Sequence, residues 1–476
     1  MRDRRMRCFI LILWLPGAVS CGKFLDVVAP GSKIEASKIY EDNTTAMMAL
    51  YSIYGSMFNQ GASPAKIARY TGLCSDELKL TWSSDDDGLY SNNISTGNVY
   101  VTGMWNTGYL YIRDANDVYW GCAGAEKLDP LIRKQLMAEA LFIRAYWLFY
   151  LTNLYGDIPL PVTTDVQVNA LLPRSLQRDV YQQIISDLLT VQNELGDNYI
   201  GPDCVSPSSE RTRPNKAAAT ALLARVYLFM GRYEDAAAQA STIIDMTDTY
   251  ALVPLDQVFL KNSTEAIWQL MPGTPNVTKI NTTEGNEFII NVPPKYKTQQ
   301  AISNALLGAF GQYDQRKKSW INSFTDRSVA PAITYYFPYK YKVRIGDDLK
   351  EYSMIFRLAE MYLIRAECRA QLGEIAAALA DLNMIRQRAG LPVLSADQQD
   401  KYTLLNAILK ERQVEFFTEQ GHRWFDLKRM GAIDTVMTIE TPAKGGGIWN
   451  ATKRLWPIPK EEIVQDPNLY QNPGYP

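Results

Sequence analysis

Residues 217–245 read AAATALLARVYLFMGRYEDAAAQASTIID, and the spacing of their residues indicates two packed helices joined by a tight turn. Small and aromatic residues recur at helical intervals on both sides of a single glycine. The recurring positions are Ala224, Tyr227, Gly231, Tyr233, Ala236 and Ala240. Small alanine and glycine side chains let two helices approach closely, and the tyrosine rings fill the space between them. The stretch therefore predicts a helix–turn–helix unit.

This unit fits the pattern of a tetratricopeptide repeat, AxxYxxxGxYxxA. A second, weaker copy lies downstream, with its glycine and alanine again five positions apart, at Ala366, Gly373, Ile375, Ala378 and Leu382. One repeat cannot bury its apolar face alone, so two copies 142 residues apart predict that the chain returns to the same helical stack. We predict an all-α fold, a right-handed tetratricopeptide-like superhelix that carries long irregular insertions.

Three further helices are predicted upstream, over about residues 42–57, 101–120 and 130–156. Asp42 can cap the first helix, and Pro130 is acceptable in the first turn of the third. The third helix is apolar on nearly all sides, so we expect it to be central.

The helical period is lost over residues 60–98, 247–350 and 431–476. Loops of this length are usually functional or disordered. These three contain Trp, Tyr and Phe, whose rings need something to pack against. We therefore expect ordered, functional insertions.

Charge and composition exclude several classes of protein. The chain has 476 residues, of which 47% are hydrophobic and 21% charged, so it can bury a large core. Its 49 Lys and Arg nearly balance 51 Asp and Glu, so no concentrated positive field exists to hold nucleic acid. His422 is the only histidine, which excludes metal sites that need two or three of them, and a Ser/His/Asp triad would have to use it.

The first twenty residues have the pattern of a secretory signal. Four arginines precede the apolar run 8–15, which is too short to span a bilayer of about 30 Å. Ala18 and Ser20 stand just before Cys21, as in a bacterial lipobox, so we predict that residues 1–20 are removed and that Cys21 is lipidated. An ordinary cleavage site is the alternative. Residues 21–476 carry a net charge of −5.

The remaining cysteines form no metal or redox motif. None of them has CxxC spacing, and they are Cys74, Cys122, Cys204 and Cys368. Export permits disulfides, but a core of this size does not require them. We predict free, buried thiols.

Several short stretches carry a family resemblance when they are taken in chain order. They are CGKFLD (21–26), the W…Y..I..AN pattern (105–116), AEALFIRA (138–145), LYGDIP (154–159), RPNKAA (213–218), RLAEMYLIRAE (357–367), EQGHRWFDLKR (419–429), LWPIP (455–459) and NPGY (472–475). Together they resemble the SusD/RagB family, the surface-exposed nutrient-binding lipoproteins of Bacteroidetes. The resemblance spans essentially the whole mature chain.

The resemblance implies one SusD-like domain over residues 21–476 with four tetratricopeptide-like units. Its N-terminal SusD-like region runs to about residue 230, and its RagB/SusD region covers about 231–476 with the insertion 247–350. It also implies a lipid-anchored protein on the surface of the outer membrane. Such a protein acts as a lid on a SusC-like TonB-dependent transporter, captures oligosaccharides or, in the RagB branch, peptides, and uses no cofactor or metal.

A sugar ligand requires flat aromatic faces and polar groups that bond its hydroxyls. In the first insertion we select Trp82 and Tyr90 as ring contacts, with polar partners Asp76, Arg69 and Asn92 or Asn93. In the second insertion we select Tyr296, Trp320, Tyr335 and Tyr336. These residues are chosen by chemistry and region and not by a matched motif.

Two other patterns have a functional and a structural interpretation. Glu411, Glu415 and Glu419 share a helix face, as acid/base catalysis in a secreted glycoside hydrolase would require, but we favour a packed structural signature that includes His422. The run Asp85-Asp86-Asp87-Gly88 lacks the alternating ligands and the final Glu of a calcium loop, so we expect a solvated acidic turn.

Overall fold

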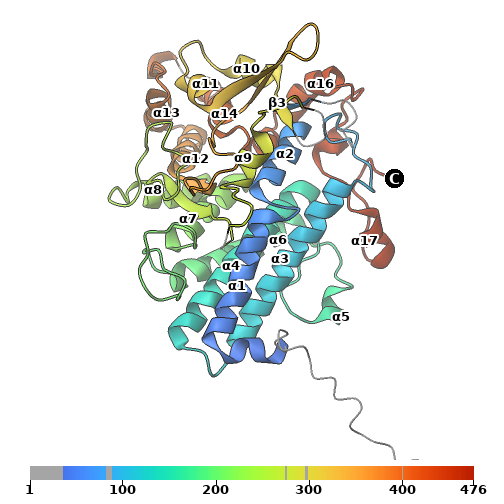
Figure 1. The fold of residues 1–476 in the computed structure, drawn as a ribbon, viewed down its shortest axis with the longest axis vertical. Helices are drawn as coiled ribbons and strands as arrows, with labels where there is room; N and C mark the ends of the chain where they lie inside the picture. Colours follow the sequence, from blue (N-terminus) through green and yellow to red (C-terminus); the bar gives the residue numbers. More distant parts are fainter. Residues whose placement is uncertain (1–35, 82–87, 274–275, 295–298, 399) are drawn as a thin grey trace, which may run out of the picture.

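A computed structural model describes residues 36–81, 88–273, 276–294, 299–398 and 400–476. The three predicted upstream helices are confirmed as α1 (Asn43–Asn59), α3 (Val99–Ala123) and α4 (Pro130–Tyr155). They run side by side in the lower half of Figure 1. The Asp42 carboxylate caps α1 by accepting the N–H of Thr44 at 2.9 Å. Twenty of the 26 residues of α4 are buried, which confirms its predicted central place.

Both predicted repeat units are helix pairs. The first is α7 (Lys216–Phe229) with α8 (Tyr233–Ile244), and the second is α12 (Leu358–Gln371) with α13 (Ile375–Arg388). Helix α8 packs directly on α12, which confirms that the chain returns to the same stack. Helix α6 (Gln177–Glu194) packs on both α4 and α7, and α14 (Lys401–Phe416) packs on α12.

A third helix pair, α15 (His422–Arg429) and α16 (Ile433–Ala443), was not predicted. Its helices are joined by the same kind of tight turn, which we call the corner of a pair. In all three corners a glycine has positive φ, as the left-handed end of a helix requires. The residue after each glycine donates its N–H to a carbonyl five residues back: Arg232 to Tyr227 at 2.9 Å, Glu374 to Arg369 at 2.8 Å and Ala432 to Leu427 at 2.9 Å.

The regions without helical period contain short elements. The first holds α2 (Pro64–Cys74), of which ten residues are buried, and β1 (Leu78–Leu80). The second holds β2 (Ala266–Leu270), α9 (Thr283–Phe288), β3 (Gln300–Ile302), α10 (Asn304–Ala309), α11 (Gln315–Trp320), β4 (Ile321–Asp326) and β5 (Ile333–Pro338). The third begins with α16 and also holds η3 (Ala451–Arg454) and α17 (Lys460–Gln465). The minor elements elsewhere are η1 (Ala36–Glu41), α5 (Val166–Asn169) and η2 (Ala396–Gln398).

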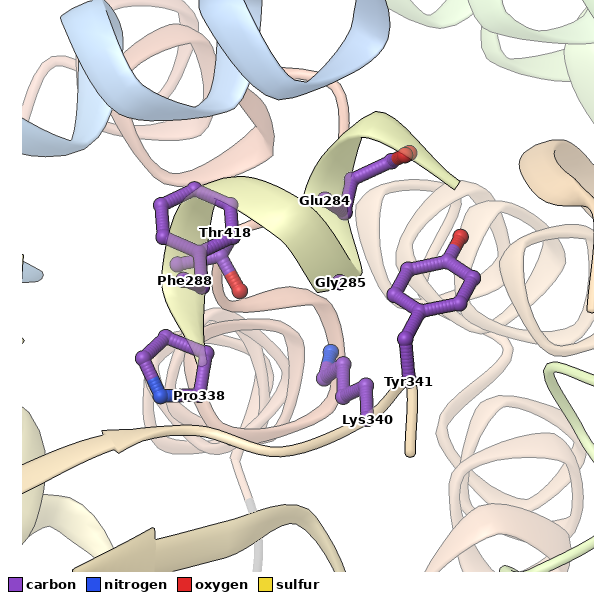
Figure 2. Close-up of a pocket in the computed structure, with 7 residues that line it drawn as sticks. All are labelled: Glu284, Gly285, Phe288, Pro338, Lys340, Tyr341 and Thr418. Carbon is purple, nitrogen blue, oxygen red and sulfur yellow. The ribbon is translucent and has the colours of Figure 1, made fainter. Parts of the chain in front are cut away.

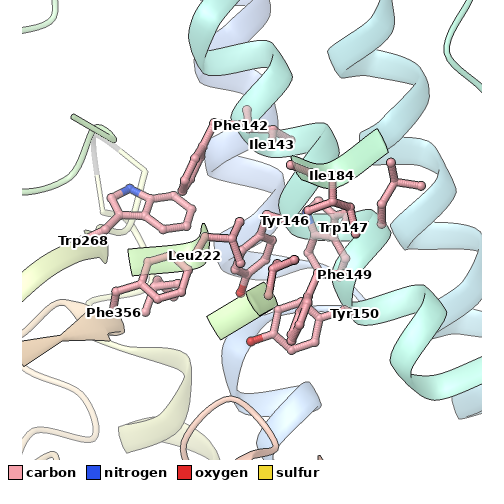
Figure 3. Packing of buried hydrophobic residues seen from close by; sticks show 14 of the residues in the cluster. Phe142, Ile143, Tyr146, Trp147, Phe149, Tyr150, Ile184, Leu222, Trp268 and Phe356 are labelled. Carbon is pink, nitrogen blue, oxygen red and sulfur yellow. The ribbon is translucent and has the colours of Figure 1, made fainter. Parts of the chain in front are cut away.

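The described strands form three antiparallel pairs: β1 with β3, β4 with β5, and β2 with β6 (Ser353–Arg357). The β1–β3 pair joins the first region to the second. The β2–β6 pair is fully buried, and the main core forms where α4 meets it. Figure 3 shows Trp268 of β2 stacked on Phe356 of β6, with ring centroids 5.9 Å apart. Phe142 and Tyr146 of α4 approach Trp268 edge-on at 5.0 and 5.6 Å.

The predicted free, buried thiols are confirmed at Cys74, Cys122, Cys204 and Cys368. Among the described residues, no helix combines the length and the apolar character that crossing a membrane requires. The predicted signal segment 1–20, the lipidation site Cys21 and the acidic run 85–87 lie outside the described residues.

Candidate functional site

The first and second insertions meet and form one structural unit. Strand β1 of the first pairs with β3 of the second, so that Leu78 lies opposite Ile302 and Leu80 opposite Gln300. Helix α2 is tied to α9 by an ion pair between Arg69 and Glu287, with 2.8 Å between Nη1 and Oε1. We call this unit, residues 64–81 and 283–302 as far as they are described, the insertion junction.

Lys66, the half-buried residue of α2, strengthens the junction. Its Nζ lies 3.1 Å from the carboxylate of Glu287, and the two residues are 221 positions apart in the sequence. Thr81 adds a hydrogen bond from its hydroxyl to the carbonyl of Gln299 at 2.6 Å. Two regions distant in sequence are therefore held next to each other.

The hairpin β4–β5 lies beside the junction, at the top of Figure 1. Its inner face carries Phe324 opposite Tyr335, and both rings pack on a small apolar cluster that contains Ile289 and Ile290. Tyr336 belongs to the other face and is 43% exposed. Of the selected aromatic residues in the described part of the second insertion, Tyr336 offers an exposed ring and Tyr335 a half-buried one.

The selection of Trp320 is wrong. Its side chain is 0% exposed and belongs to a second apolar core. Its ring centroid lies 5.6 Å from that of Phe259 and 6.5 Å from that of Phe417. Its indole N–H donates to the carbonyl of Leu255 at 2.8 Å. A sealed indole ring cannot stack on a ligand, and its polar atom is already satisfied.

The selection of Asp76 as a ligand partner is also wrong. Its buried carboxylate accepts two hydrogen bonds from Arg423, from Nε at 2.8 Å and from Nη2 at 2.7 Å. Gln413 donates a third at 3.1 Å. Asp76 therefore anchors the first insertion to α14 and α15, because a buried charge requires such partners.

Arg69 and Asn92 have structural roles of the same kind. Arg69 is buried and forms the ion pair of the insertion junction. Asn92 is buried too: its amide donates to the carbonyl of Cys74 at 2.9 Å, and its oxygen accepts the hydroxyl of Thr441 at 3.0 Å. Both predictions are therefore corrected. The polar groups of Arg69 and Asn92, which we expected to bind a ligand, hold chain segments together instead.

The remaining selected residues have mixed outcomes. Tyr90 is half-buried, with the Lys444 ammonium 5.3 Å from its ring centroid. Asn93, the alternative to Asn92, is exposed. Trp82 and Tyr296 lie outside the described residues, so their contact with a ligand stays a prediction.

The carboxylates of α14 and of Glu419 form an ionic core and not a catalytic centre. The predicted shared helix face is corrected, because α14 ends at Phe416 and Glu419 lies in the turn that follows it. Glu415 is fully buried, with one oxygen 2.6 Å from Arg357 and the other 2.8 Å from Arg316. Burial alone would raise the pKa of Glu415, but the charges of Arg388, Arg357 and Arg316 outweigh burial and hold this pKa below its usual range. Glu419 is also buried and pairs with Arg357 at 2.8 Å. The structural interpretation of these carboxylates is confirmed.

Sequence reasoning found these carboxylates but missed the cations that surround them. Arg316 comes from α11 and Arg388 from the end of α13, and Glu265, just before β2, completes the network with Arg357 at 3.0 Å. The signal was available, because carboxylates in a segment that is predicted to be packed are buried only with paired cations.

His422 also has the structural role that we favoured. Its ring is buried and lies 4.7 Å from that of Phe416. Burial, together with the nearby charges of Arg225 and Arg412, lowers the pKa of His422 well below its usual value. The imidazole is therefore neutral and packed inside the protein.

A small cavity lies between α9 and the end of β5, and it is too small for a sugar. It measures about 10 Å³, room for one water at most. Figure 2 shows Lys340 and Tyr341 projecting from the chain after β5 towards the helix that carries Glu284. Burial raises the pKa of Glu284 to about 7 and lowers that of Lys340 to about 8. Glu284 accepts the hydroxyl of Ser353 at 2.7 Å and Lys340 donates to the carbonyl of Glu415 at 2.8 Å, so both tie the second insertion to the core.

Comparisons with known proteins agree with the architecture. A family model described as SusD family matches residues 298–475, and one described as starch-binding associating with outer membrane matches residues 23–228. A SusD-like protein of Formosa agariphila is 24% identical over 98% of each chain. Another from the same organism is 26% identical over 81% of this chain and 83% of the relative.

Solved structures show the same fold. A SusD superfamily protein of Bacteroides vulgatus has a TM-score of 0.75 and 21% identity, and the match covers 92% of this chain and all of that one. Surface glycan-binding protein A of Bacteroides fluxus has a TM-score of 0.70 and 26% identity, over 90% of this chain and 99% of that one. The predicted tetratricopeptide-like superhelix with long insertions is confirmed.

Proposed function

Because this chain belongs to the SusD family, we propose that it is a surface-exposed, non-catalytic lipoprotein that captures oligosaccharides for a SusC-like TonB-dependent transporter. Residues 21–476 form one domain in this proposal, and lipid on Cys21 holds it at the outer membrane. The structurally similar protein of Bacteroides fluxus is named a surface glycan-binding protein, which supports a sugar ligand for this chain.

The insertion junction is the observation that carries the proposal. It holds the polar first insertion against the aromatic second insertion, at the end of the molecule where the hairpin β4–β5 projects. Tyr336 supplies an exposed ring for the C–H face of a pyranose. Trp82 and Tyr296 are proposed as further ring contacts, and Tyr90, Tyr335 and Asn93 as neighbours of the ligand.

Glycan affinity electrophoresis tests this proposal. We expect a soluble polysaccharide in the gel to retard the protein, and no reducing ends to appear on prolonged incubation. Tyr336→Ala and Trp82→Ala should each reduce retardation several-fold, because each removes a stacking face worth about 1 kcal/mol or more. Tyr402→Ala is the matched control, since Tyr402 is 77% exposed on α14, outside both insertions.

The other outcomes separate the alternatives. Retardation that is unchanged in both Tyr336→Ala and Trp82→Ala would refute the aromatic site. Retention by peptides and by no glycan would identify peptide capture, which the RagB branch of the family suggests. Release of reducing ends would identify a glycoside hydrolase.

A further inference from the structure

A separate groove of about 630 Å³ runs between α3, the segment 159–172 and α17. None of its lining residues belongs to the insertion junction or to the hairpin β4–β5. We call it the α3 groove. Its apolar lining includes Trp105, Tyr109, Pro159, Val166, Ala170 and Leu469.

Exposed apolar side chains continue the lining onto the surface. Val166 is 78% exposed on α5, and Val168 and Leu171, which follow it, are also exposed. Trp120, one helical turn beyond the groove on α3, is exposed too. An apolar surface of this kind, joined to a groove, is typical of a contact with another molecule.

The charged groups of the α3 groove are mainly carboxylates. Asp117 of α3, Glu462 of α17 and Asp466 line it. Among the lining residues that the structure describes, Arg113 is the cation, and its guanidinium lies 2.7 Å from the carboxylate of Asp114. Burial raises the pKa of Glu462, because water stabilises its carboxylate less there than in solution. A cation bound beside Glu462 would stabilise the carboxylate instead. The groove therefore suits a positively charged, apolar ligand.

The wall formed by the segment 159–172 has backbone carbonyls that side chains of the protein already occupy. Its carbonyls are bonded by side chains of α3: Tyr109 O–H donates to Pro159 at 2.8 Å, Asn116 to Pro161 at 3.0 Å and Trp120 to Val162 at 2.9 Å. An extended peptide gains affinity by pairing with free backbone groups, and these three carbonyls are already bonded. A helix satisfies its own backbone and binds through side chains alone.

We propose that the α3 groove binds a basic amphipathic helix of a partner protein. Its apolar face packs on the floor of the groove and on Val166, and its Lys or Arg side chains meet Asp117, Glu462 and Asp466. A phospholipid surface fits less well, because phosphate groups would face the same carboxylates.

Fluorescence anisotropy with a designed helix tests this proposal on the purified full chain. The probe is a labelled leucine/lysine peptide of about 18 residues with one apolar and one cationic face. The first comparison peptide has Glu in place of every Lys. The second has two central residues replaced by proline, which breaks the helix. We expect the helical Lys peptide to bind at least about tenfold more tightly than either comparison peptide.

Variants locate the binding to the groove. Ala170→Trp fills the groove without changing its charge and should reduce affinity about tenfold or more. Asp117→Asn, an exposed change that leaves the fold intact, should weaken binding several-fold and flatten its dependence on salt. Asp248→Asn, an exposed carboxylate outside the groove, is the matched control.

Three results would overturn the proposal. The first is equal affinity for the Lys and Glu peptides, and the second is unchanged affinity in both Ala170→Trp and Asp117→Asn. The third is a protein that binds phosphatidylcholine vesicles but not the peptide, and that loses vesicle binding in Ala170→Trp. That result would make this face a membrane contact. Glycan retardation is measured in the same variants and should not change, so failure here is distinguishable from failure of the proposed sugar site.

Discussion

Two aromatic residues of the second insertion, Trp320 and Tyr336, lie in opposite environments. Trp320 closes a second core with Phe259 and Phe417, whereas Tyr336 is exposed on the hairpin. We predict that Trp320→Ala lowers the free energy of unfolding by about 3–5 kcal/mol, because it leaves a large cavity. Tyr336→Ala should change it by less than about 1 kcal/mol. Urea denaturation of both variants measures this difference, and equal midpoints would contradict the assignment.

Glu77 gives a prediction about pH. Burial, reinforced by the charge of Asp76, raises the pKa of Glu77 from 4.5 to about 8. One of its oxygens, Oε1, is buried without a hydrogen-bond partner, as suits a neutral carboxyl. The folded state therefore holds this proton more tightly than the unfolded state. The contribution of Glu77 to stability is complete below about pH 4.5 and is lost as the pH rises to about 8.

Glu77→Gln should remove this loss. Between pH 5 and pH 8 the stability of the unmodified protein should fall relative to that of the variant by about 3–4 kcal/mol. Glu284 shifts in the same direction, but it is present in both proteins and cancels in the comparison. Urea unfolding at the two pH values provides the measurement, and parallel pH profiles would show that Glu77 is not buried as a neutral acid.

At the scale of elements, the ionic core ties α14 to α11, α13 and β6. Glu415 is its centre, because Arg316, Arg357 and Arg388 all meet its carboxylate. We predict that Glu415→Ala costs about 3–5 kcal/mol of stability, since it leaves buried guanidinium groups without their main counter-charge. Glu374→Ala, at an exposed carboxylate 4.0 Å from Arg369, should cost less than about 0.5 kcal/mol. A similar loss in both variants would contradict a buried network.

The helices were predictable from sequence because their signals are local. Each signal lies within or next to a single helix: Asp42 caps α1, and the spacing and the turn glycine identify the pair α7–α8. The pair α15–α16 was missed although Gly431 stands at its corner as Gly231 does in the first pair, because the 8 residues of α15 make about two turns, too few to show a repeating period. The same Met-Gly dipeptide precedes both second helices and was the available signal.

The strand pairs and polar contacts were not predictable from local patterns. Strands β1 and β3 have three residues each, too few to show an alternating pattern, and their partners lie far apart in the sequence. Asp76 and Arg69 were selected because their chemistry suits a sugar. Their burial depends on Arg423 and Glu287, which only the complete fold brings to them.

At the scale of the whole molecule, the proposed sugar site is assembled from two excursions of one helical stack. Its geometry therefore depends on the insertion junction, where Glu287 pairs with both Lys66 and Arg69. We predict that Glu287→Gln weakens glycan retardation several-fold, because the neutral amide holds the buried Arg69 less firmly. Hydrogen–deuterium exchange should rise in β1 and β3 and stay unchanged in α7 and α8, which pack elsewhere. Exposed Glu126→Gln is the matched control. Unchanged exchange in β1 and β3 would show that strand pairing alone holds the two insertions together. If exchange in β1 and β3 rises in Glu287→Gln while glycan retardation stays unchanged, ligand binding does not depend on the junction.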